Sequence, residues 1–291
     1  MPVVYYGASA NRAVPSSFTL MSGEDKLLFS DAVEEIKGER LALVIHSPGG
    51  LVETVEAIVG LLRPRFAEVL SIVPDYAMSA ATLLALAGDR IAMDERSAIG
   101  PIDPQVMVTV VPPRGGEPTR EFVPAQSILE GFSKARRAIQ RGGASSLPAY
   151  LPLLDKYSLH QFEICRNATS LSQSLAEDWL AKYMFSSLTR RSARAKARRI
   201  ARELVAHKKH LSHGRPIGVD KAHDLGLTIL DTRDEPKLRD AIWELHCTAS
   251  LWFEKTPVCY KLCMNSDGLF LMKLHGVQIA QAQPQEPKQE R

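Results

Sequence analysis

Three short apolar runs that alternate with helical segments are the strongest constraint on how this chain can fold. The runs cover residues 40–46, 66–73 and 90–93. Continuous apolar runs of this length are typical of parallel strands that are buried on both faces. The segments between them, 51–62 and 80–87, have the apolar spacing or the small residues of helices. This alternation predicts an α/β fold with a parallel sheet and right-handed crossovers.

The pattern outside this core adds strands near the start of the chain and helices toward its end. We expect strands over residues 1–7 and 106–111, helices over 23–37, 124–141, 154–183, 189–207 and 237–253, and a short helix with a closing strand over 217–230. The C-terminal half is therefore predicted to be mainly helical. One domain spanning residues 1–275 is expected, followed by a disordered polar tail over 276–291.

The composition is that of a globular protein. The 291 residues are 45% apolar and 24% charged. The four cysteines have no framework spacing, so we expect free thiols in a reducing compartment. No apolar run reaches the roughly 18 residues of a membrane span, and the first residues lack the features of a signal peptide. We therefore expect a cytoplasmic protein, and the pattern leaves peripheral membrane association open.

The net charge of +3 conceals one strongly basic segment. Residues 190–215 hold ten Lys and Arg and one acid, whereas the remainder of the chain holds 26 basic and 32 acidic residues. A nucleic-acid-binding protein usually spreads its basic charge over a larger face. We therefore expect a solvated helix face or a contact with an acidic subunit, and no nucleic-acid partner.

Ser79 stands between an apolar strand and a helix of small residues, in the sequence Tyr-Ala-Met-Ser-Ala-Ala. A serine in this place lies at a helix N-terminus, where backbone N–H groups can bind an anion. Small neighbours let a substrate carbonyl approach closely. The arrangement is that of a nucleophile elbow, although the Gly-x-Ser-x-Gly pattern is absent. Taken alone, the serine is more simply interpreted as a helix cap.

Gly49 and Gly50 follow the preceding apolar strand, in the sequence His-Ser-Pro-Gly-Gly. Paired glycines allow positive φ angles and leave their N–H groups unhindered, so they could form an oxyanion hole. Pro-Gly-Gly is also a common turn. The two features gain weight together, because the carboxyl ends of neighbouring parallel strands meet at one edge of a sheet, where such folds place their sites.

Several motifs recur together in the order of a known family. They are SPGG (47–50), YAMSAATLLAL (76–86) and GPIDPQ (100–105), supported by WLAKYMF (179–185), SHGRPI (212–217) and AHDLGL (222–227). As a set they resemble the serine dehydrogenase proteinase family of the Clp protease/crotonase superfamily, with the Clp proteolytic subunit and signal peptide peptidase A as relatives. The resemblance covers roughly residues 3–275. It implies a Clp/crotonase-like spiral of ββα units, often assembled into homo-oligomers.

The resemblance also implies a chemistry. It makes Ser79 the nucleophile, and it makes Gly50, with Gly49, and the N–H of Ala80 the oxyanion donors. This is serine acyl transfer through an acyl-enzyme. The expected activity is an ATP-independent serine peptidase that takes a peptide or protein substrate and needs no cofactor.

The sequence leaves the general base open. Where the Clp subunit has its catalytic histidine, this chain has residues 100–103 and no histidine. His213 falls near the third triad member of the Clp subunit, and Lys134 stands on a later helix, as the base of signal peptide peptidases does. Lys156 and His160 are further alternatives. A buried lysine can act as a base because desolvation removes its charge.

Two more patterns are weighed against plainer interpretations. Asp103 is interpreted as bonding backbone N–H groups beside Pro104 rather than as orienting a base. His207, His210 and His213 have a spacing that could gather a metal ion, but no acid completes the set and basic residues crowd it. We therefore expect no metal.

Two alternative functions remain for a chain of this pattern. The first is a catalytically degenerate scaffold that keeps the fold and an oligomeric binding surface, which the missing Clp-type histidine supports. The second is an acyl-CoA enzyme of the crotonase type. It fits less well, because Ser79 would have no role in enoyl hydration.

Overall fold

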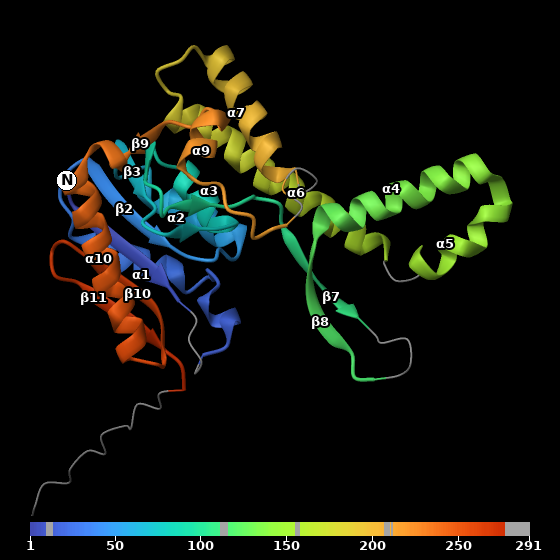
Figure 1. Ribbon diagram of the computed structural model, residues 1–291, viewed down its shortest axis with the longest axis horizontal. Coiled ribbons are helices and arrows are strands. Elements are labelled where there is room, and N and C mark those ends of the chain that lie inside the picture. The colour runs from blue at the N-terminus through green and yellow to red at the C-terminus, as the bar shows by residue number, and fades with distance from the viewer. Residues whose placement is uncertain (10–13, 111–115, 155–157, 207–209, 211, 277–291) are drawn as a thin grey trace, which may run out of the picture.

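A seven-stranded sheet forms the centre of the protein, which is seen in a computed structural model (Figure 1) that describes residues 1–9, 14–110, 116–154, 158–206, 210 and 212–276. The strand order is β11-β10-β1-β2-β3-β5-β9. The strands from β1 to β9 are parallel, and β10 and β11 are antiparallel to their neighbours. Their bounds are β1 Val3–Ala8, β2 Arg40–His46, β3 Glu68–Ile72, β5 Arg90–Met93, β9 Ile229–Asp231, β10 Cys259–Asn265 and β11 Phe270–Leu274. The expected α/β fold with a mostly parallel sheet is therefore confirmed.

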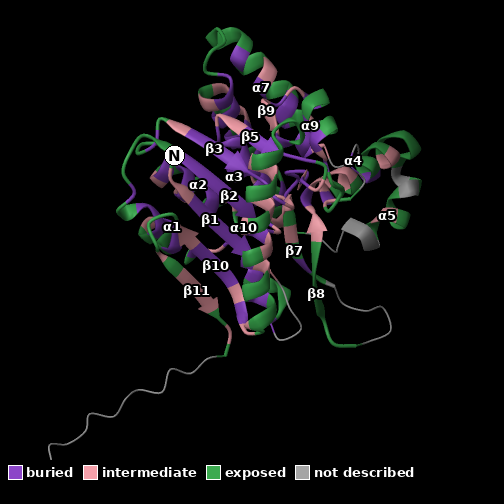
Figure 2. Ribbon diagram, turned by 60° about the vertical axis from the view of Figure 1, so that its left-hand side comes forward, coloured by how far each residue is buried: buried purple, intermediate pink, exposed green. Residues whose placement is uncertain are grey.

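Strand β2 shows how the apolar pattern builds the two faces of the sheet. Leu41, Leu43 and Ile45 pack on one face, and Ala42 and Val44 pack on the other. The first face is covered by α1 Asp25–Glu34, α2 Val52–Leu62 and α3 Ala80–Leu86. The second face is covered by α10 Pro236–Lys255, which crosses the sheet in Figure 2. A strand buried on both sides needs apolar residues at every position, which is why β2 reads as a continuous apolar run.

The C-terminal half contains a strand pair that the sequence pattern did not predict. Strand β10 pairs antiparallel with β1, and β11 pairs with β10, so the sheet is mixed and the half-chain is not purely helical. Lys261 interrupts the apolar pattern of β10, which is why the strand was missed. Its ammonium group is buried and donates to Asp25 Oδ2 at 2.6 Å and to the Leu20 carbonyl at 2.8 Å.

An arm projects from the core, on the right in Figure 1. A small apolar cluster that includes Val108, Ile128 and Cys165 holds the base of the arm together. The arm consists of β7 Gln105–Val110, β8 Thr119–Pro124, α4 Ala125–Gly142, a 3-10 turn η2 Gly143–Ser146, α5 Leu147–Leu154 and the start of α6 Leu159–Trp179. The helix predicted over 154–183 is present as α6 with its π-helical end, but it begins at Leu159. A separate helix ends at Leu154, and α6 ends in a π-helical turn, η3 Leu180–Met184.

Shorter elements complete the fold. Helix α7 Arg190–Val205 packs against α6, buries Ala193, Ala197, Ala201 and Leu204, and leaves its arginines exposed. This exposure fits both expectations, a solvated face and a contact with an acidic subunit. The remaining elements are η1 Ser16–Thr19, β4 Tyr76–Ala77, β6 Ala98–Ile99, α9 Val219–Leu225 and η4 Thr232–Asp234. Among the described residues, no helix has the length and apolarity to cross a membrane. The predicted polar tail lies outside the described residues, apart from its first position.

Candidate active site

Ser79 has the most unusual backbone of the site. It connects β4 to α3 with φ 54° and ψ −119°, and it is the one non-glycine residue with a positive φ in the described part of the chain. Such a conformation costs about 1–3 kcal/mol and persists only where the surroundings impose it. The Ser79 side chain makes no capping hydrogen bond to α3. The plain helix-cap interpretation therefore does not account for this serine.

The two glycines lie beside Met21 in a short parallel bridge. Met21 N–H donates to the Gly49 carbonyl at 2.7 Å, and Leu51 N–H donates to the Met21 carbonyl at 2.9 Å. In a parallel bridge the N–H of the residue between these two bonds points to the opposite side. The Gly50 N–H is therefore directed away from Met21.

The glycine loop lies directly against the serine. A Cβ atom placed on Gly49 would stand 2.8 Å from Ser79 Cβ and 3.0 Å from Ala80 N. A Cβ placed on Gly50 would stand 2.2 Å from Met21 N. Both glycines also have positive φ, 103° and 154°. Only glycine fits at either position without displacing backbone. The approach to the Ser79 turn requires glycine at position 49, and the approach to Met21 requires it at position 50.

Strand pairing holds the glycine loop and the serine in register. Ser47 N–H donates to the Tyr76 carbonyl at 3.1 Å, and Met78 N–H donates to the Ser47 carbonyl at 3.0 Å. The Ser47 hydroxyl also accepts from Gly49 N–H at 3.1 Å. The edge predicted from the two strand ends is therefore the place where the loop and the serine meet.

Backbone N–H groups from both segments are available for a developing oxyanion. Ala80 is the first residue of α3, where an N–H has no acceptor within its own helix. Gly50 N–H points away from its bridge partner. One donor from a glycine loop and one from the residue after the nucleophile is the composition of an oxyanion hole.

Thr82 fixes the turn that carries Ser79. Its buried hydroxyl donates to the Ala77 carbonyl at 2.7 Å and accepts from Gly100 N–H at 3.0 Å. Gly100 in turn lies close to the serine, because a Cβ placed on it would stand 3.4 Å from Ser79 N. The segment after β6 therefore passes directly beside the nucleophile position.

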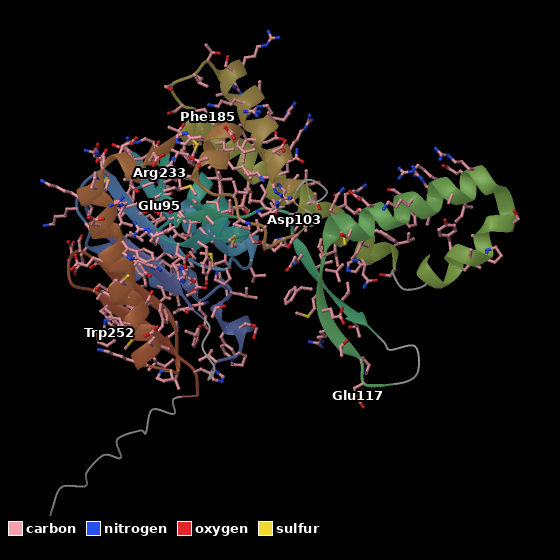
Figure 3. The ribbon with its side chains drawn as sticks, viewed as in Figure 1. Glu95, Asp103, Glu117, Phe185, Arg233 and Trp252 are labelled. Carbon is pink, nitrogen blue, oxygen red and sulfur yellow. The ribbon has the colours of Figure 1, made fainter. Side chains whose placement is uncertain are left out.

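His213 and Asp103 form a pair at the end of that segment. His213 Nδ1 lies 2.9 Å from Asp103 Oδ1; the carboxylate is fully buried, and the imidazole is 18% exposed. Asp103 stands where the core meets the arm (Figure 3). With Nδ1–H donating to Asp103, the ring presents the lone pair of Nε2 outward. The interpretation of Asp103 as a local backbone acceptor is corrected, because Oδ1 contacts a histidine 110 residues away.

Long-range pairing brings this histidine to the loop after β6. Ile217 N–H donates to the Ile99 carbonyl at 2.8 Å, and Ile99 N–H donates back to Ile217 at 3.1 Å. This bridge places the segment that carries His213 alongside β6. No local signal in the sequence marked Asp103 and His213 as partners, because the contact depends on two distant loops.

The other base candidates lie elsewhere. Lys134 is exposed in the middle of α4, on the arm, and the described residues show no contact between it and Ser79. His160 is exposed in the first turn of α6. Lys156 lies outside the described residues. Of the metal-binding histidines weighed from the sequence, His210 bonds the Glu203 carbonyl at 2.9 Å and His213 bonds Asp103, while residue 207 is not described.

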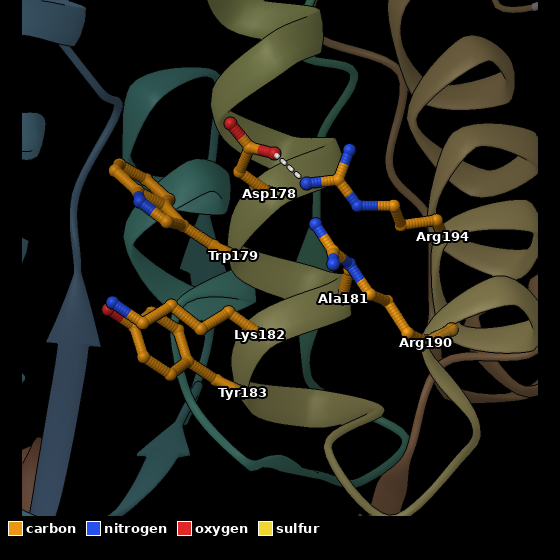
Figure 4. A pocket seen from close by; sticks show the side chains of 8 residues that line it. Asp178, Trp179, Ala181, Lys182, Tyr183, Arg190 and Arg194 are labelled. Carbon is orange, nitrogen blue, oxygen red and sulfur yellow. Dashed lines mark ion pairs between the residues drawn. The ribbon is translucent and has the colours of Figure 1, made fainter.

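A separate pocket lies between α6 and α7 (Figure 4) and is lined by none of these residues. Its polar lining is mainly cationic, with Lys182, Arg190 and Arg194. Arg194 lies 4.0 Å from Asp178, a distance at which an exposed ion pair contributes little. Because Ser79, His213 and Asp103 do not line the pocket, we assign it no part in the chemistry of Ser79.

The comparisons with known proteins point to the same segment. Residues 22–113 match the model of the ClpP-like SDH-type serine proteinase family. This segment holds both glycines, Ser79 and Asp103, so the resemblance seen in the sequence is confirmed.

Two relatives come from Methanocaldococcus jannaschii. The uncharacterized protein MJ0137 is 31% identical over 193 residues, which are 66% of this chain and 54% of the relative. The uncharacterized protein MJ1495 is 29% identical over 187 residues, which are 64% of this chain and 51% of the relative. The chain thus spans about half the length of these relatives.

Solved structures give a more remote likeness. A mutant of the 1510-N membrane-bound stomatin-specific protease is 18% identical with a TM-score of 0.30, covering 45% of this chain and 63% of its own. A second mutant of that protease, in complex with a substrate peptide, is 14% identical with a TM-score of 0.39. The match covers 72% of this chain and 70% of the protease chain.

Proposed function

We propose that this chain is an ATP-independent serine peptidase that cleaves peptide bonds through an acyl-enzyme on Ser79. The observation that carries the proposal is the strained conformation of Ser79 directly against the glycine loop. A strained serine whose side chain does not cap α3, next to two outward N–H groups, has the parts that acyl transfer requires. The family whose model matches residues 22–113 supports the same chemistry.

The proposed reaction uses His213 as the general base. Ser79 Oγ forms a bond to the substrate carbonyl carbon while its proton passes to His213 Nε2, and the oxyanion accepts from Gly50 and Ala80 N–H groups. The imidazolium then gives the proton to the leaving amine as the C–N bond breaks. Water next releases the acyl group, with His213 taking the proton of the attacking water. Asp103 holds the ring through Nδ1 in both steps.

The position of the pair supports His213 over the lysines. Asp103 follows Gly100, which packs against Ser79 N, so the pair lies at the site edge rather than on the arm. Lys134 is the second candidate base, and it is exposed in the middle of α4, on the arm. Catalytic hydrogen bonds are often long without substrate, so the Ser79–His213 contact is expected to close when a peptide binds.

We also propose a homo-oligomer that uses the arm. Large apolar side chains are exposed along it, with Leu159 at 80%, Leu151 at 43% and Phe122 at 53%. Exposed apolar groups gathered on one extension are uncommon in monomers. Helix α10 packs one apolar face on the sheet and leaves Leu251 and Trp252 exposed, at 49% and 43%, so it offers a second contact. Light scattering at micromolar concentration is expected to give a multiple of 32.1 kDa, and a value near 32.1 kDa would contradict the proposal.

A fluorophosphonate probe tests the enzyme proposal. We expect the wild-type chain to label on Ser79, the Ser79→Ala variant not to label, and the His213→Gln variant to label about 10²–10⁴-fold more slowly. Lys134→Met should label at the wild-type rate.

Ser158→Ala is the matched control. Ser158 caps α6 through a complete capping box, so this variant should lose about 0.5–2 kcal/mol of stability and keep full labelling. If the wild type neither labels nor cleaves any of a varied set of peptides, the degenerate scaffold replaces the enzyme.

A further inference from the structure

A cluster of two histidines and an aspartate lies at the same sheet edge but behind the glycine loop. His46 ends β2, Asp75 precedes β4, and His246 stands on α10. One ligand atom from each residue lies within 4.8 Å of the other two. His46 Nδ1 is 3.6 Å from Asp75 Oδ2, and His246 Nε2 is 4.0 Å from the same oxygen.

Both separations are longer than a hydrogen bond between nitrogen and oxygen, whose upper limit is about 3.2–3.5 Å. His46 is 6% exposed and His246 is 5% exposed. His46 Nδ1 has no hydrogen-bond partner among the described residues. A buried ring nitrogen without a partner costs about 1–3 kcal/mol of folding stability. The cluster therefore has room for a further group that His46 Nδ1 can bind.

We propose that His46, Asp75 and His246 bind one divalent transition-metal ion of the zinc class. Two imidazoles and one carboxylate are ligands that zinc takes readily, with a water in the remaining position. At metal–ligand distances of about 2.0–2.2 Å, tetrahedral ligand atoms stand about 3.3–3.5 Å apart. The observed 3.6 and 4.0 Å are close to this spacing, and small side-chain rotations close the difference.

The surroundings have the features of an outer shell. Tyr5 OH lies 3.1 Å from His246 Nδ1, which orients the ring so that Nε2 faces the cluster. Such partners fix the tautomer of a ligating histidine. The rings of Tyr76 and Trp243 pack against the two histidines, at centroid distances of 4.2 and 5.5 Å. Asp75 is 42% exposed, so an ion can enter from solvent on its side.

The charge state of the cluster is compatible with a metal. Burial lowers the pKa of His46 to about 3 and also lowers the pKa of His246. In both rings burial favours neutral imidazole, which is the form that ligates a metal. Arg96, the cation that stacks on Trp243, is paired with Asp94 and does not neutralise Asp75.

The ion would join three elements that position the peptidase site. His46 is followed directly by Ser47, which pairs with the strand that leads into Ser79. Asp75 begins that strand, and α10 covers the opposite face of the sheet. The bound ion would act as a positioning group for the sheet edge, on the face away from Ser79.

Cobalt(II) and zinc(II) titrations of the full chain, after chelator treatment, test the site. We expect one cobalt ion per chain, with visible d–d absorption of low coordination number, displaced by zinc. Asp75→Asn and His246→Gln should each weaken cobalt binding by more than about 100-fold, and Tyr5→Phe should weaken it about 10–100-fold. Exposed His160→Asn and His223→Asn are matched controls and should bind as the wild type does.

A loss of cobalt binding can be distinguished from a loss of folding. Asp75 is partly exposed, so Asp75→Asn should keep the wild-type circular dichroism even where His246→Gln loses stability. The proposal is overturned if the wild type binds no cobalt, or if binding survives both Asp75→Asn and His246→Gln. Loss of binding in His213→Gln with retention in Asp75→Asn would also overturn it, and would place the ion at the other histidines.

Discussion

Two candidate sites of different kinds lie on opposite sides of the sheet edge where β2 ends. On one side, the loop that ends at Gly50 meets Ser79 and offers backbone N–H groups in a strained, side-chain-poor setting. On the other side, His46 meets Asp75 and His246 and offers side-chain nitrogen and oxygen in a buried, aromatic setting. His46 is the last residue of β2 and Gly50 stands four positions later in the loop, so one short stretch of chain contributes to both sites.

The two sides are destabilised by different features. On the serine side the unfavourable feature is backbone strain, which close packing against Gly49 imposes. On the histidine side it is a buried nitrogen without a partner. Strain prepares a nucleophile for attack, whereas an unpartnered ligand atom prepares a place for an ion.

Among variants that keep Ser79, Asp103→Asn should give the largest effect on the serine side. The amide has no negative charge to stabilise the imidazolium, and its NH2 group can face Nδ1 and favour the wrong tautomer of His213, so we expect probe labelling of Ser79 to slow about 10²–10⁴-fold. Stopped-flow or timed labelling measures this rate. Asp224→Asn, at an exposed aspartate on α9, is the control and should label normally. Unchanged labelling in Asp103→Asn would remove His213 from the reaction.

Gly50→Ala should break the serine side structurally. The new Cβ would meet Met21 backbone atoms at 2.2–2.7 Å, and φ is 154°. We expect a loss of about 2–5 kcal/mol in the free energy of unfolding, because overpacking and a strained backbone each cost about 1–3 kcal/mol. Urea denaturation measures the loss. Gly131→Ala, in open space on α4, should instead be neutral or slightly stabilising.

Thr82→Val tests how tightly the Ser79 turn is clamped. Removing the buried hydroxyl leaves the Gly100 and Ala77 groups with fewer partners, so we expect a loss of about 1–3 kcal/mol in the free energy of unfolding. Labelling of Ser79 should slow as well. Thr82→Ser keeps the hydroxyl and is the control. If both variants are equally destabilised, packing of the methyl group is responsible rather than the clamp.

Ser79→Gly separates strain from chemistry. Glycine adopts this positive φ without strain. Its greater freedom in the unfolded chain lowers the free energy of unfolding by about 0.5–1 kcal/mol. Because the strain is about 1–3 kcal/mol, we expect a net gain of about 1 kcal/mol in the free energy of unfolding together with complete loss of labelling. Ser158→Gly, which loses a helix cap, should be slightly destabilised instead. A destabilised Ser79→Gly would mean that the serine side chain itself stabilises the fold.

The smallest expected effect is that of a change at Ser79 on cobalt binding at the histidine cluster. Ser79→Ala should change cobalt affinity at the histidine cluster by less than about twofold, since sites without shared partners add independently. Equilibrium titration measures the affinity of both chains. A larger change would show that the sheet edge transmits shifts between its two faces.

Local patterns in the sequence determined the frame of the site. The apolar run of β2 was predicted with its observed bounds, Arg40–His46, and the turn into α3 was placed at Ser79. The paired glycines were predicted to lie at the same edge as the serine. These predictions succeeded because burial on both faces, helix spacing and glycine content are properties of neighbouring residues.

Other parts could not be predicted from the local pattern. Strand β10 was missed because Lys261 breaks its apolar run, and Asp25, which pairs with that lysine, lies 236 residues away. The long helix over 154–183 was wrong in its bounds because the residues before α6 and the π-helical turn after it gave no clear break. The roles of Gly49, Gly50, Ala80, His213 and Lys134 stay predictions until labelling tests them.

The sequence by itself determined the central parallel strands, where the chain turns at the sheet edge, and that a serine and two glycines stand there. The tertiary structure decided the strain at Ser79, the pairing of Asp103 with His213, and the meeting of His46 with His246. The reason is physical. Apolar period and turn chemistry act between neighbours along the chain, whereas a partner 110 residues away is chosen by how loops and helices pack once the core has formed.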